Sequence, residues 1–217
     1  MDQGEIIVGI DEAGRGPLFG RVYASAVILS DDFDTTILKD SKKFTSFKKI
    51  YSVYEEIKNK SKYYSVNYAD ESEIDEINIL QATQRAMHKC VKDIIQQIID
   101  NEDIESISKL RLKVDGNYFN DYTQFMNDEI TVIPHECVIK GDDKVKAISA
   151  ASILAKVDRD LYIENICKTH PDLDEKYDLV KNKGYGTKKH RDGIQQYGYS
   201  EFHRKSFKLK SLNVPRN

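Results

Sequence analysis

Hydrophobic residues near the N-terminus form two short runs separated by a glycine-rich bend. The first run covers residues 5–10 (EIIVGI) and the second covers residues 22–29 (VYASAVIL). Short apolar runs rich in β-branched residues and bounded by turn residues are typical of buried strands. The two runs therefore predict a hairpin, and Asp11 and Glu12 follow its first strand directly.

Longer segments further along the chain place apolar residues three and four positions apart, which is the spacing of an amphipathic helix. This spacing predicts helices over residues 46–60, 74–100 and 145–167. Shorter runs predict strands over residues 63–68, 110–114 and 130–139, the last of them broken by Pro134. The third helix begins AISAASILAK, and its Ala and Ser side chains should let it pack closely on its neighbours. Strands alternating with long helices indicate an α/β sheet.

The composition is that of a folded protein from a reducing compartment. Hydrophobic residues make up 40% and charged residues 32% of the 217 positions, which excludes intrinsic disorder. Cys90, Cys137 and Cys167 are odd in number and never form a CxxC pair, so neither a disulfide framework nor a thiolate zinc site is indicated. The N-terminus shows no signal-peptide pattern and no run is long enough for a transmembrane helix. We expect a cytoplasmic protein without a membrane partner.

The net charge of −3 conceals an uneven distribution. Residues 176–217 hold eleven Lys or Arg against three Asp or Glu, a net charge of +8 that leaves −11 for residues 1–175. A basic segment on an acidic chain favours a polyanionic partner, because Lys and Arg bind phosphates through counterion release. A solvated, lysine-rich surface is the alternative.

Four acids lie at or just past the ends of predicted strands: Asp11, Glu12, Asp115 and Asp142. Two carboxylates about 4 Å apart repel by roughly 4 kcal/mol at an effective dielectric constant near 20, so such a cluster needs a cation. Because no His or Cys joins the set, the hard oxygen ligands favour Mg²⁺ or Mn²⁺ over Zn²⁺. Two such ions could clamp the attacking and leaving oxygens of a phosphodiester displacement.

The alternative is that each acid merely caps a helix or a turn. Glu12 also requires an irregular backbone, because adjacent strand residues point to opposite faces. Gly14 and Gly16, which follow at once, would supply that freedom. We interpret Asp143, Asp158 and Asp160 as surface or helix-face partners, with Asp160 a minor rival to Asp142.

Three loops are candidates for nucleic-acid contacts. Gly14, Arg15 and Gly16 could let a backbone or ribose approach closely, with Arg15 meeting a phosphate. Lys42 lies in a second basic stretch, LKDSKKF, and Tyr185 lies in a third, GYGTKKH, where its ring could stack on a base or sugar. A plain turn, and an ordinary half-buried tyrosine, are the alternatives.

These motifs together resemble ribonuclease HII, a type 2 ribonuclease H family. IVGIDEAGRGPLFG, LKDSKK, EIDEINILQAT, KVDGN, VIKGDDKVKAISAASILAKVDRD, NKGYGTKKH and HRKSF occur in family order from residue 6 to residue 207. The resemblance implies an RNase H-like fold: a mixed five-stranded sheet flanked by helices, with a helical C-terminal extension. We expect residues 1–168 to form the catalytic domain and residues 169–217 to form a basic helical extension packed on it.

The resemblance also implies a function and roles for the candidate residues. Asp11, Glu12, Asp115 and Asp142 match the family's four acids, which we expect to hold two Mg²⁺ or Mn²⁺ ions with Asp11 bridging them. In the family, the Gly14-Arg15-Gly16 motif and the tyrosine at Tyr185 recognise the ribose 2′-hydroxyl and the adjoining deoxynucleotide.

We therefore expect a monomeric, metal-dependent endoribonuclease that cuts RNA/DNA hybrids and incises duplex DNA 5′ to embedded ribonucleotides, leaving 3′-hydroxyl and 5′-phosphate ends. A non-catalytic hybrid-binding protein would be favoured by loss of an acid, but all four are present. A transposase or integrase of related fold would leave the Gly14-Arg15-Gly16 motif and Tyr185 unexplained.

Overall fold

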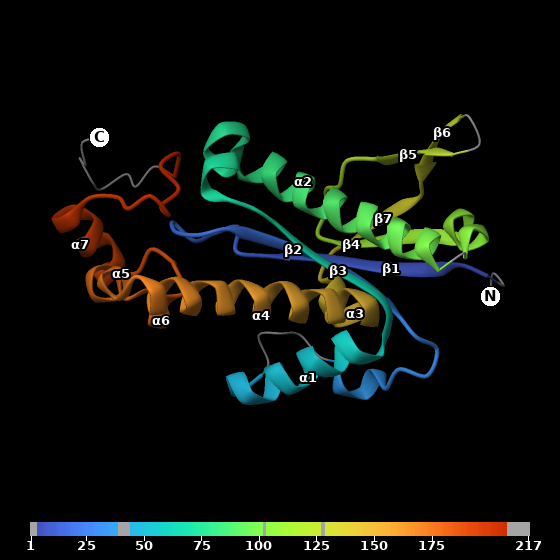
Figure 1. The fold of residues 1–217 in the computed structure, drawn as a ribbon, viewed down its shortest axis with the longest axis horizontal. Helices are drawn as coiled ribbons and strands as arrows, with labels where there is room; N and C mark the ends of the chain where they lie inside the picture. Colours follow the sequence, from blue (N-terminus) through green and yellow to red (C-terminus); the bar gives the residue numbers. More distant parts are fainter. Residues whose placement is uncertain (1–3, 39–43, 102, 127–128, 208–217) are drawn as a thin grey trace.

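A mixed five-stranded sheet forms the centre of the molecule (Figure 1). The computed structural model describes residues 4–38, 44–101, 103–126 and 129–207. The strand order is β3-β2-β1-β4-β7, with β1 antiparallel to β2, β2 antiparallel to β3, and β4 parallel to both β1 and β7. The strands are β1 (Ile6–Ala13), β2 (Val22–Leu29), β3 (Ser61–Ala69), β4 (Leu110–Asp115) and β7 (His135–Val138). The predicted hairpin and mixed sheet are confirmed.

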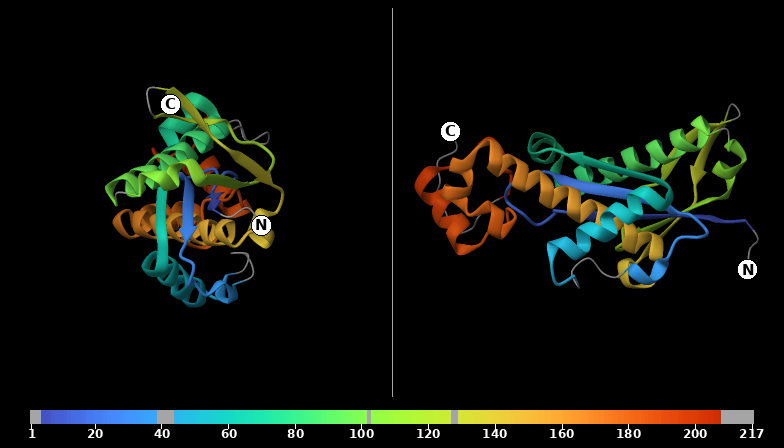
Figure 2. Two further views of the ribbon diagram at one scale, coloured as in Figure 1. Left: turned by 90° about the vertical axis from the view of Figure 1, so that its right-hand side faces the viewer. Right: turned by 60° about the horizontal axis from the view of Figure 1, so that its bottom comes forward.

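Two long helices cover the two faces of this sheet, and a third lies outside them (Figures 1 and 2). One apolar core joins β1, β2 and β4 to α2 (Glu71–Asp100). A second core joins β2 to α4 (Lys146–Thr169) and α1 (Phe47–Lys60). The expected close packing of the Ala-rich helix is confirmed at Gly9, where a Cβ atom would lie 2.1 Å from the Ala147 backbone.

The helix predicted over residues 74–100 begins earlier and is kinked. Asp70 caps it by accepting a hydrogen bond from Glu73 N at 2.8 Å. Asn78 then leaves the helical conformation, at φ 69° and ψ 162°. Its side-chain oxygen accepts bonds from the backbone N–H groups of Leu80 and Gln81 at 3.0 and 3.1 Å, so it caps the second segment.

The strand predicted over residues 130–139 is two strands in two different sheets. β6 (Glu129–Ile133) pairs with β5 (Tyr122–Met126) in a separate two-stranded sheet, whereas β7 joins the central one. Pro134 stands between them, and its carbonyl accepts a bond from Leu112 N at 2.9 Å. Proline has no N–H to donate, so the pairing changes here. β5 was not predicted.

The remaining elements are short. They are the 3₁₀ helices η1 (Thr35–Ile37) and η3 (Ile104–Lys109), and the helices α3 (Gly141–Lys144), α5 (Pro171–Tyr177), α6 (Leu179–Asn182) and α7 (Lys188–Tyr197). The last three gather at the far end of α4 around Leu18 and Phe19, in an apolar cluster with Ile163 (Figure 1). None of the helices in the described ranges has the length and apolar character needed to cross a membrane.

Candidate active site

The two strands that carry the predicted acids part at the site. β1 and β4 are paired only as far as Ile10 and Val114, so Asp11 and Asp115 are the next residues on each strand. Beyond that point β1 continues along β2, and β4 continues along β7. In open α/β sheets, ligands bind beyond the carboxyl ends of strands at such points.

Asp11 is a buried carboxylate among like charges. It is only 5% exposed. Burial raises its pKa well above the ordinary value, and the charges of Glu12 and Asp115 raise that pKa further. The Ser152 hydroxyl and the Glu12 backbone N–H, which donates to Asp11 Oδ1 at 2.7 Å, oppose the rise. Three of the predicted acids therefore act on one another electrostatically.

Glu12 lies in regular strand, paired with Ala24, so the expected irregular backbone at this residue is wrong. The backbone first becomes irregular at Gly14, where φ is +94°. That later bend brings the chain back, and Arg15 Nη1 lies 3.2 Å from Glu12 Oε1. Burial raises the pKa of Glu12, while Arg15 lowers it and the charge of Asp115 raises it. The Arg15 contact joins the acids to the loop of residues 14–20, which we call the glycine loop.

The contact that links the Asp142 segment to the other acids is made by its neighbour Gly141. Gly141 N donates to Asp115 Oδ1 at 2.6 Å and so ties the start of α3 to the end of β4. A Cβ atom on Gly141 would lie 2.6 Å from Ile148 Cδ1, so a larger residue there would require the Ile148 side chain to shift. Asp142 follows in the first turn of α3, after Lys140 at a left-handed φ of 55°. It belongs to a short helix and not to the end of a strand.

These acids fit a hard divalent cation by chemistry. Their donors are carboxylate oxygens, and the raised pKa of Asp11 shows negative charge that a cation would offset. Among the described residues, no three or more Asp, Glu, His or Cys side chains form a group that could hold a metal ion as they stand. The four acids are therefore candidate ligands by place and charge, not as a preformed cage.

The glycine loop and Tyr185 lie side by side. Leu18 N donates to Gly184 O at 2.9 Å, which fastens the two loops together. A Cβ atom on Gly16 would lie 3.3 Å from Tyr185 Cε1, so the ring lies against this glycine. The Tyr185 side chain is 48% exposed, which leaves its other surface free for contact with a ligand. Lys42 falls outside the described residues.

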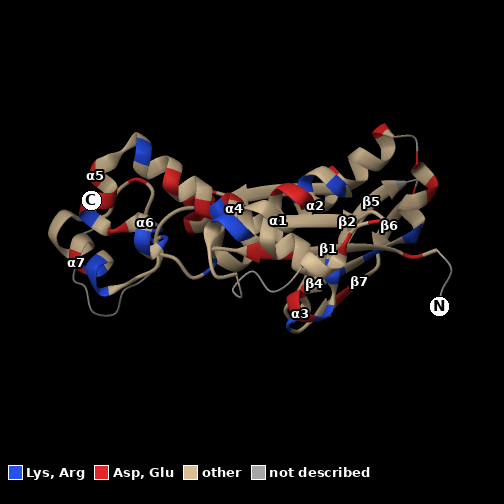
Figure 3. Cartoon of the chain, turned by 90° about the horizontal axis from the view of Figure 1, so that it is seen from below, with Lys and Arg blue, Asp and Glu red and all other residues tan. Residues whose placement is uncertain are grey.

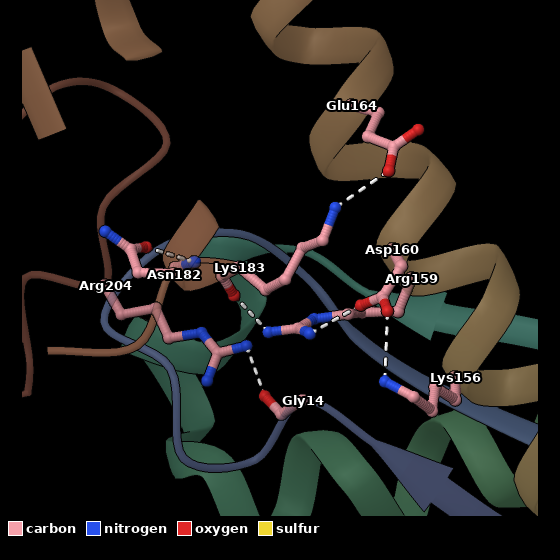
Figure 4. A network of polar contacts seen from close by, with 9 residues as sticks. Gly14, Lys156, Arg159, Asp160, Glu164, Asn182, Lys183 and Arg204 are labelled. Carbon is pink, nitrogen blue, oxygen red and sulfur yellow. Dashed lines mark hydrogen bonds and ion pairs between the residues drawn. The ribbon is translucent and has the colours of Figure 1, made fainter. Parts of the chain in front are cut away.

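Two arginines that sequence reasoning did not single out organise these loops (Figure 4). Arg159, on α4, donates to Lys183 O and to Asp160 Oδ1, and its guanidinium carbon lies 5.3 Å from the centre of the Tyr185 ring. Arg204 is fully buried and donates to carbonyls of the glycine loop. Both stand in strings that carried the family resemblance, KVDRD and HRKSF, which was the available signal.

His190 ends the GYGTKKH stretch, which the sequence predicts to be basic. For His190 this prediction is wrong. It is fully buried, and its Nε2 lies 3.0 Å from His203 Nε2. Ser200 N donates to His203 Nδ1, so His203 donates through Nε2 to His190, whose Nδ1 then donates to Tyr185 O at 3.0 Å. Burial lowers the pKa of His203 to about 3 and also lowers the pKa of His190. Both rings are neutral and support the Tyr185 backbone.

The C-terminal basic segment is partly neutralised by its own acids. Acidic and basic residues are interspersed on α5, α6 and α7 (Figure 3). Lys188 pairs with Asp192 and Lys189 pairs with Asp178, each at 2.7 Å. Both lysines remain largely exposed, at 86% and 62%, and such surface pairs are weak. They are therefore still available to a polyanion.

Comparisons with known proteins identify the family of this chain. The family model for ribonuclease HII matches residues 8–210. A ribonuclease HII of Bacteroides thetaiotaomicron is 44% identical over 204 residues, covering 94% of this chain and 90% of that protein.

Solved structures share the fold at lower identity. Ribonuclease HII from Archaeoglobus fulgidus, solved in complex with PCNA, has a TM-score of 0.67 at 22% identity over 95% of this chain and 97% of that one. Bst-RNase HIII, solved in complex with Mn²⁺, has a TM-score of 0.61 at 16% identity, covering 89% of this chain and 70% of that one. On the family match and the level of identity, the chain belongs to the ribonuclease HII family and is a ribonuclease H endonuclease.

Proposed function

We propose that this ribonuclease H, besides cutting the RNA strand of RNA/DNA hybrids, incises duplex DNA on the 5′ side of a single embedded ribonucleotide. The products would be a 3′-hydroxyl and a 5′-phosphate. The observation that carries the proposal is the Arg15–Glu12 contact, because it joins the acids of β1 to the loop on which Tyr185 rests. A group that recognises a ribonucleotide would thus stand directly beside the groups that cut.

We propose that Asp11, Glu12, Asp115 and Asp142 would hold two Mg²⁺ or Mn²⁺ ions. When bound, the ions would supply activation of the attacking water and neutralisation of charge on the leaving 3′-oxygen. Bst-RNase HIII, which has a similar fold, was solved in complex with Mn²⁺, and this supports the choice of ion. No side chain of this cluster needs to act as a nucleophile.

The substrate contacts come from this chain's own loops. The backbone of Gly14, Arg15 and Gly16 would meet the ribose 2′-hydroxyl, and the Arg15 guanidinium would meet a phosphate. The exposed face of Tyr185 would stack on the deoxynucleotide that follows the ribonucleotide. Lys42 stays a proposed substrate contact on the strength of the resemblance alone.

We also propose that the protein is a monomer and that it acts in a reducing cytoplasm. A single copy holds every proposed site residue, which favours a monomer. Cys90, Cys137 and Cys167 are all free thiols, as suits a reducing cytoplasm.

One cleavage assay tests the proposal. Three labelled substrates are compared: a duplex with one ribonucleotide, the same duplex in DNA alone, and a continuous RNA/DNA hybrid. Each is incubated with Mg²⁺, Mn²⁺ or EDTA. Cleavage of the first and third substrates, only with metal and with ends that a polymerase can extend, is expected. Cutting of the all-DNA duplex, or cleavage in EDTA, would contradict the proposal.

A further inference from the structure

We propose that Arg204 is a positioning residue that holds the glycine loop so that the backbone N–H groups of Arg15 and Gly16 face the substrate. The inference rests on the proposed function, because it concerns how the same site distinguishes a ribonucleotide. Arg204 itself touches no substrate. It lies 190 residues away from Gly14 in sequence, yet bonds to it directly.

The Arg204 guanidinium donates to main-chain carbonyls of one loop, and Figure 4 shows the bond to Gly14. Its Nη2 donates to Gly14 O at 2.6 Å and its Nε donates to Gly20 O at 2.7 Å. Its Nη1 donates to Pro17 O at 2.9 Å and to Arg15 O at 3.0 Å. Four carbonyls spread over seven residues thus converge on one planar fork of donors.

The direction of these carbonyls sets the direction of the neighbouring amides. In a trans peptide the C=O of one residue and the N–H of the next point in opposite directions, and the described residues contain no cis peptide. Since the carbonyls of Gly14 and Arg15 point at the buried guanidinium, the N–H groups of Arg15 and Gly16 point away from it. Arg15 and Gly16 are both exposed, and neither N–H donates to another group in the described part of the chain.

The charge of Arg204 strengthens these two donors. Among the described residues, the hydrogen-bond acceptors of the guanidinium are neutral carbonyls. A charged donor polarises the peptide group to which it bonds, so the N–H at the other end becomes a better donor in turn. Burial lowers the pKa of Arg204 to about 10, which still leaves it charged at neutral pH.

The C-terminal segment holds Arg204 in place through main-chain bonds. Arg204 N donates to Leu18 O and Gly20 N donates to Phe202 O, both at 2.9 Å, and Phe19 forms an antiparallel bridge with His203. Arg204 is therefore held at both its backbone and its guanidinium group. A lysine has one compact ammonium with three donors and cannot span the four carbonyls, so Arg204→Lys keeps the charge and loses the geometry.

The test compares affinities without cleavage. Fluorescence anisotropy in EDTA measures binding of wild type and Arg204→Lys to a duplex with one ribonucleotide and to the same duplex in DNA alone. The variant should lose about tenfold of the preference for the ribonucleotide, as expected when two hydrogen bonds weaken, while binding plain DNA as before. Ile98→Ala, a core change near the C-terminal end of α2, controls for lost stability and should keep the preference.

Each outcome bears on a different statement. An unchanged preference in folded Arg204→Lys would overturn the inference alone. A wild-type protein with no preference and no cleavage would overturn the proposed function and this inference with it. Should Arg204→Lys fail to fold, amide exchange in the wild type decides. The amides of Arg15 and Gly16 should gain protection from the ribonucleotide duplex but not from plain DNA, and equal exchange in both complexes would overturn the inference.

Discussion

The fold by itself disfavours the ionised form of the Asp11 carboxyl group. Its pKa in the folded protein lies above its ordinary value of 3.8 because of burial and two neighbouring carboxylates. The stability that a carboxyl group with a raised folded-state pKa contributes is fully present below its ordinary pKa and is lost as the pH rises through the folded-state pKa. Above the ordinary pKa of Asp11, this carboxyl group therefore costs the metal-free protein stability, which a bound cation would restore.

We expect Asp11→Asn to abolish cleavage and to stabilise the metal-free protein. The amide keeps the shape and removes a repelling charge, so the melting temperature should rise by about 2 to 4 °C for each kcal/mol of repulsion removed. Thermal melts with and without Mg²⁺, together with the cleavage rate, measure both effects. Mg²⁺ should raise the melting temperature of wild type and of Asp31→Asn, an exposed acid beyond β2, but not that of Asp11→Asn. More than a tenth of the wild-type rate in Asp11→Asn would rule out its proposed role.

Tyr185→Ala should remove the stacking surface. The expected loss is about 1 to 3 kcal/mol, or roughly 5- to 150-fold in rate, on the duplex with one ribonucleotide. The continuous hybrid should lose less, because it has no ribonucleotide–deoxynucleotide junction there. Tyr185→Phe should be milder, since it keeps the ring.

The matched control for Tyr185 is Tyr197→Ala. Tyr197 lies on α7 and is similarly exposed, at 51% against 48%. It should affect neither substrate. Equal proportional losses on both substrates in Tyr185→Ala, accompanied by a lower melting temperature, would show that the ring only packs.

Helix α7 presents Lys188 and Lys189 to solvent, each in an ion pair. Replacing both with Ala should weaken binding to hybrid and plain duplex alike. It should also flatten the dependence of log K on log salt by up to about one unit for each phosphate that is no longer neutralised. Titrations at several salt concentrations measure this slope. Lys92→Ala with Lys109→Ala, two exposed lysines on α2 and η3, should leave the slope unchanged. An unaltered slope in the α7 variant would mean that these lysines only solvate the surface.

The molecule as a whole depends on its C-terminal part for the shape of the site. The cluster around Phe19 joins α4 to α5, α6 and α7, and Arg204 reaches the glycine loop from beyond them. We propose that residues 169–217 form an extension packed on a catalytic domain of residues 1–168, and the part of this proposal that concerns 1–3, 39–43, 102, 127–128 and 208–217 lies outside the described residues. The neutral His190–His203 pair lies inside this contact.

Acid should weaken the contact between the C-terminal extension and the rest of the chain. His203 has a folded-state pKa of about 3, far below its ordinary value of 6.5, so the unfolded chain binds more protons between these pH values. The stability that neutral His203 contributes is therefore complete above about pH 6.5 and is lost as the pH falls toward 3. The expected slope for one such group is about 1.4 kcal/mol of unfolding free energy per pH unit.

Urea unfolding at pH 5 and pH 7 measures this loss. His203→Gln should show a smaller difference between the two pH values than wild type, because glutamine does not titrate. His170→Gln, at an exposed histidine, should behave as wild type. A wild-type difference in His203→Gln would locate the acid sensitivity elsewhere.

Much of the fold and of the site could be read from local pattern. Strand and helix periods placed β1, β2 and α4, and the position of Asp11, Glu12 and Asp115 at strand ends marked them as candidates. Hydrophobic period and turn chemistry act over a few residues, so a sequence shows them directly. The kink at Asn78 and strand β5 were not predicted, because side-chain capping and strand pairing decide them and the apolar pattern does not mark either.

By itself, the sequence determined the central hairpin and the long helices, marked Asp11, Glu12 and Asp115 as candidates, and showed which family the motifs resemble. Only the tertiary structure decided that His190 is neutral, that Lys188 and Lys189 are paired, and that Arg204 is buried. The physical reason is that the charge and the partners of a polar side chain depend on the chain packed around it. That chain comes from up to 190 residues away, as Gly14 does for Arg204.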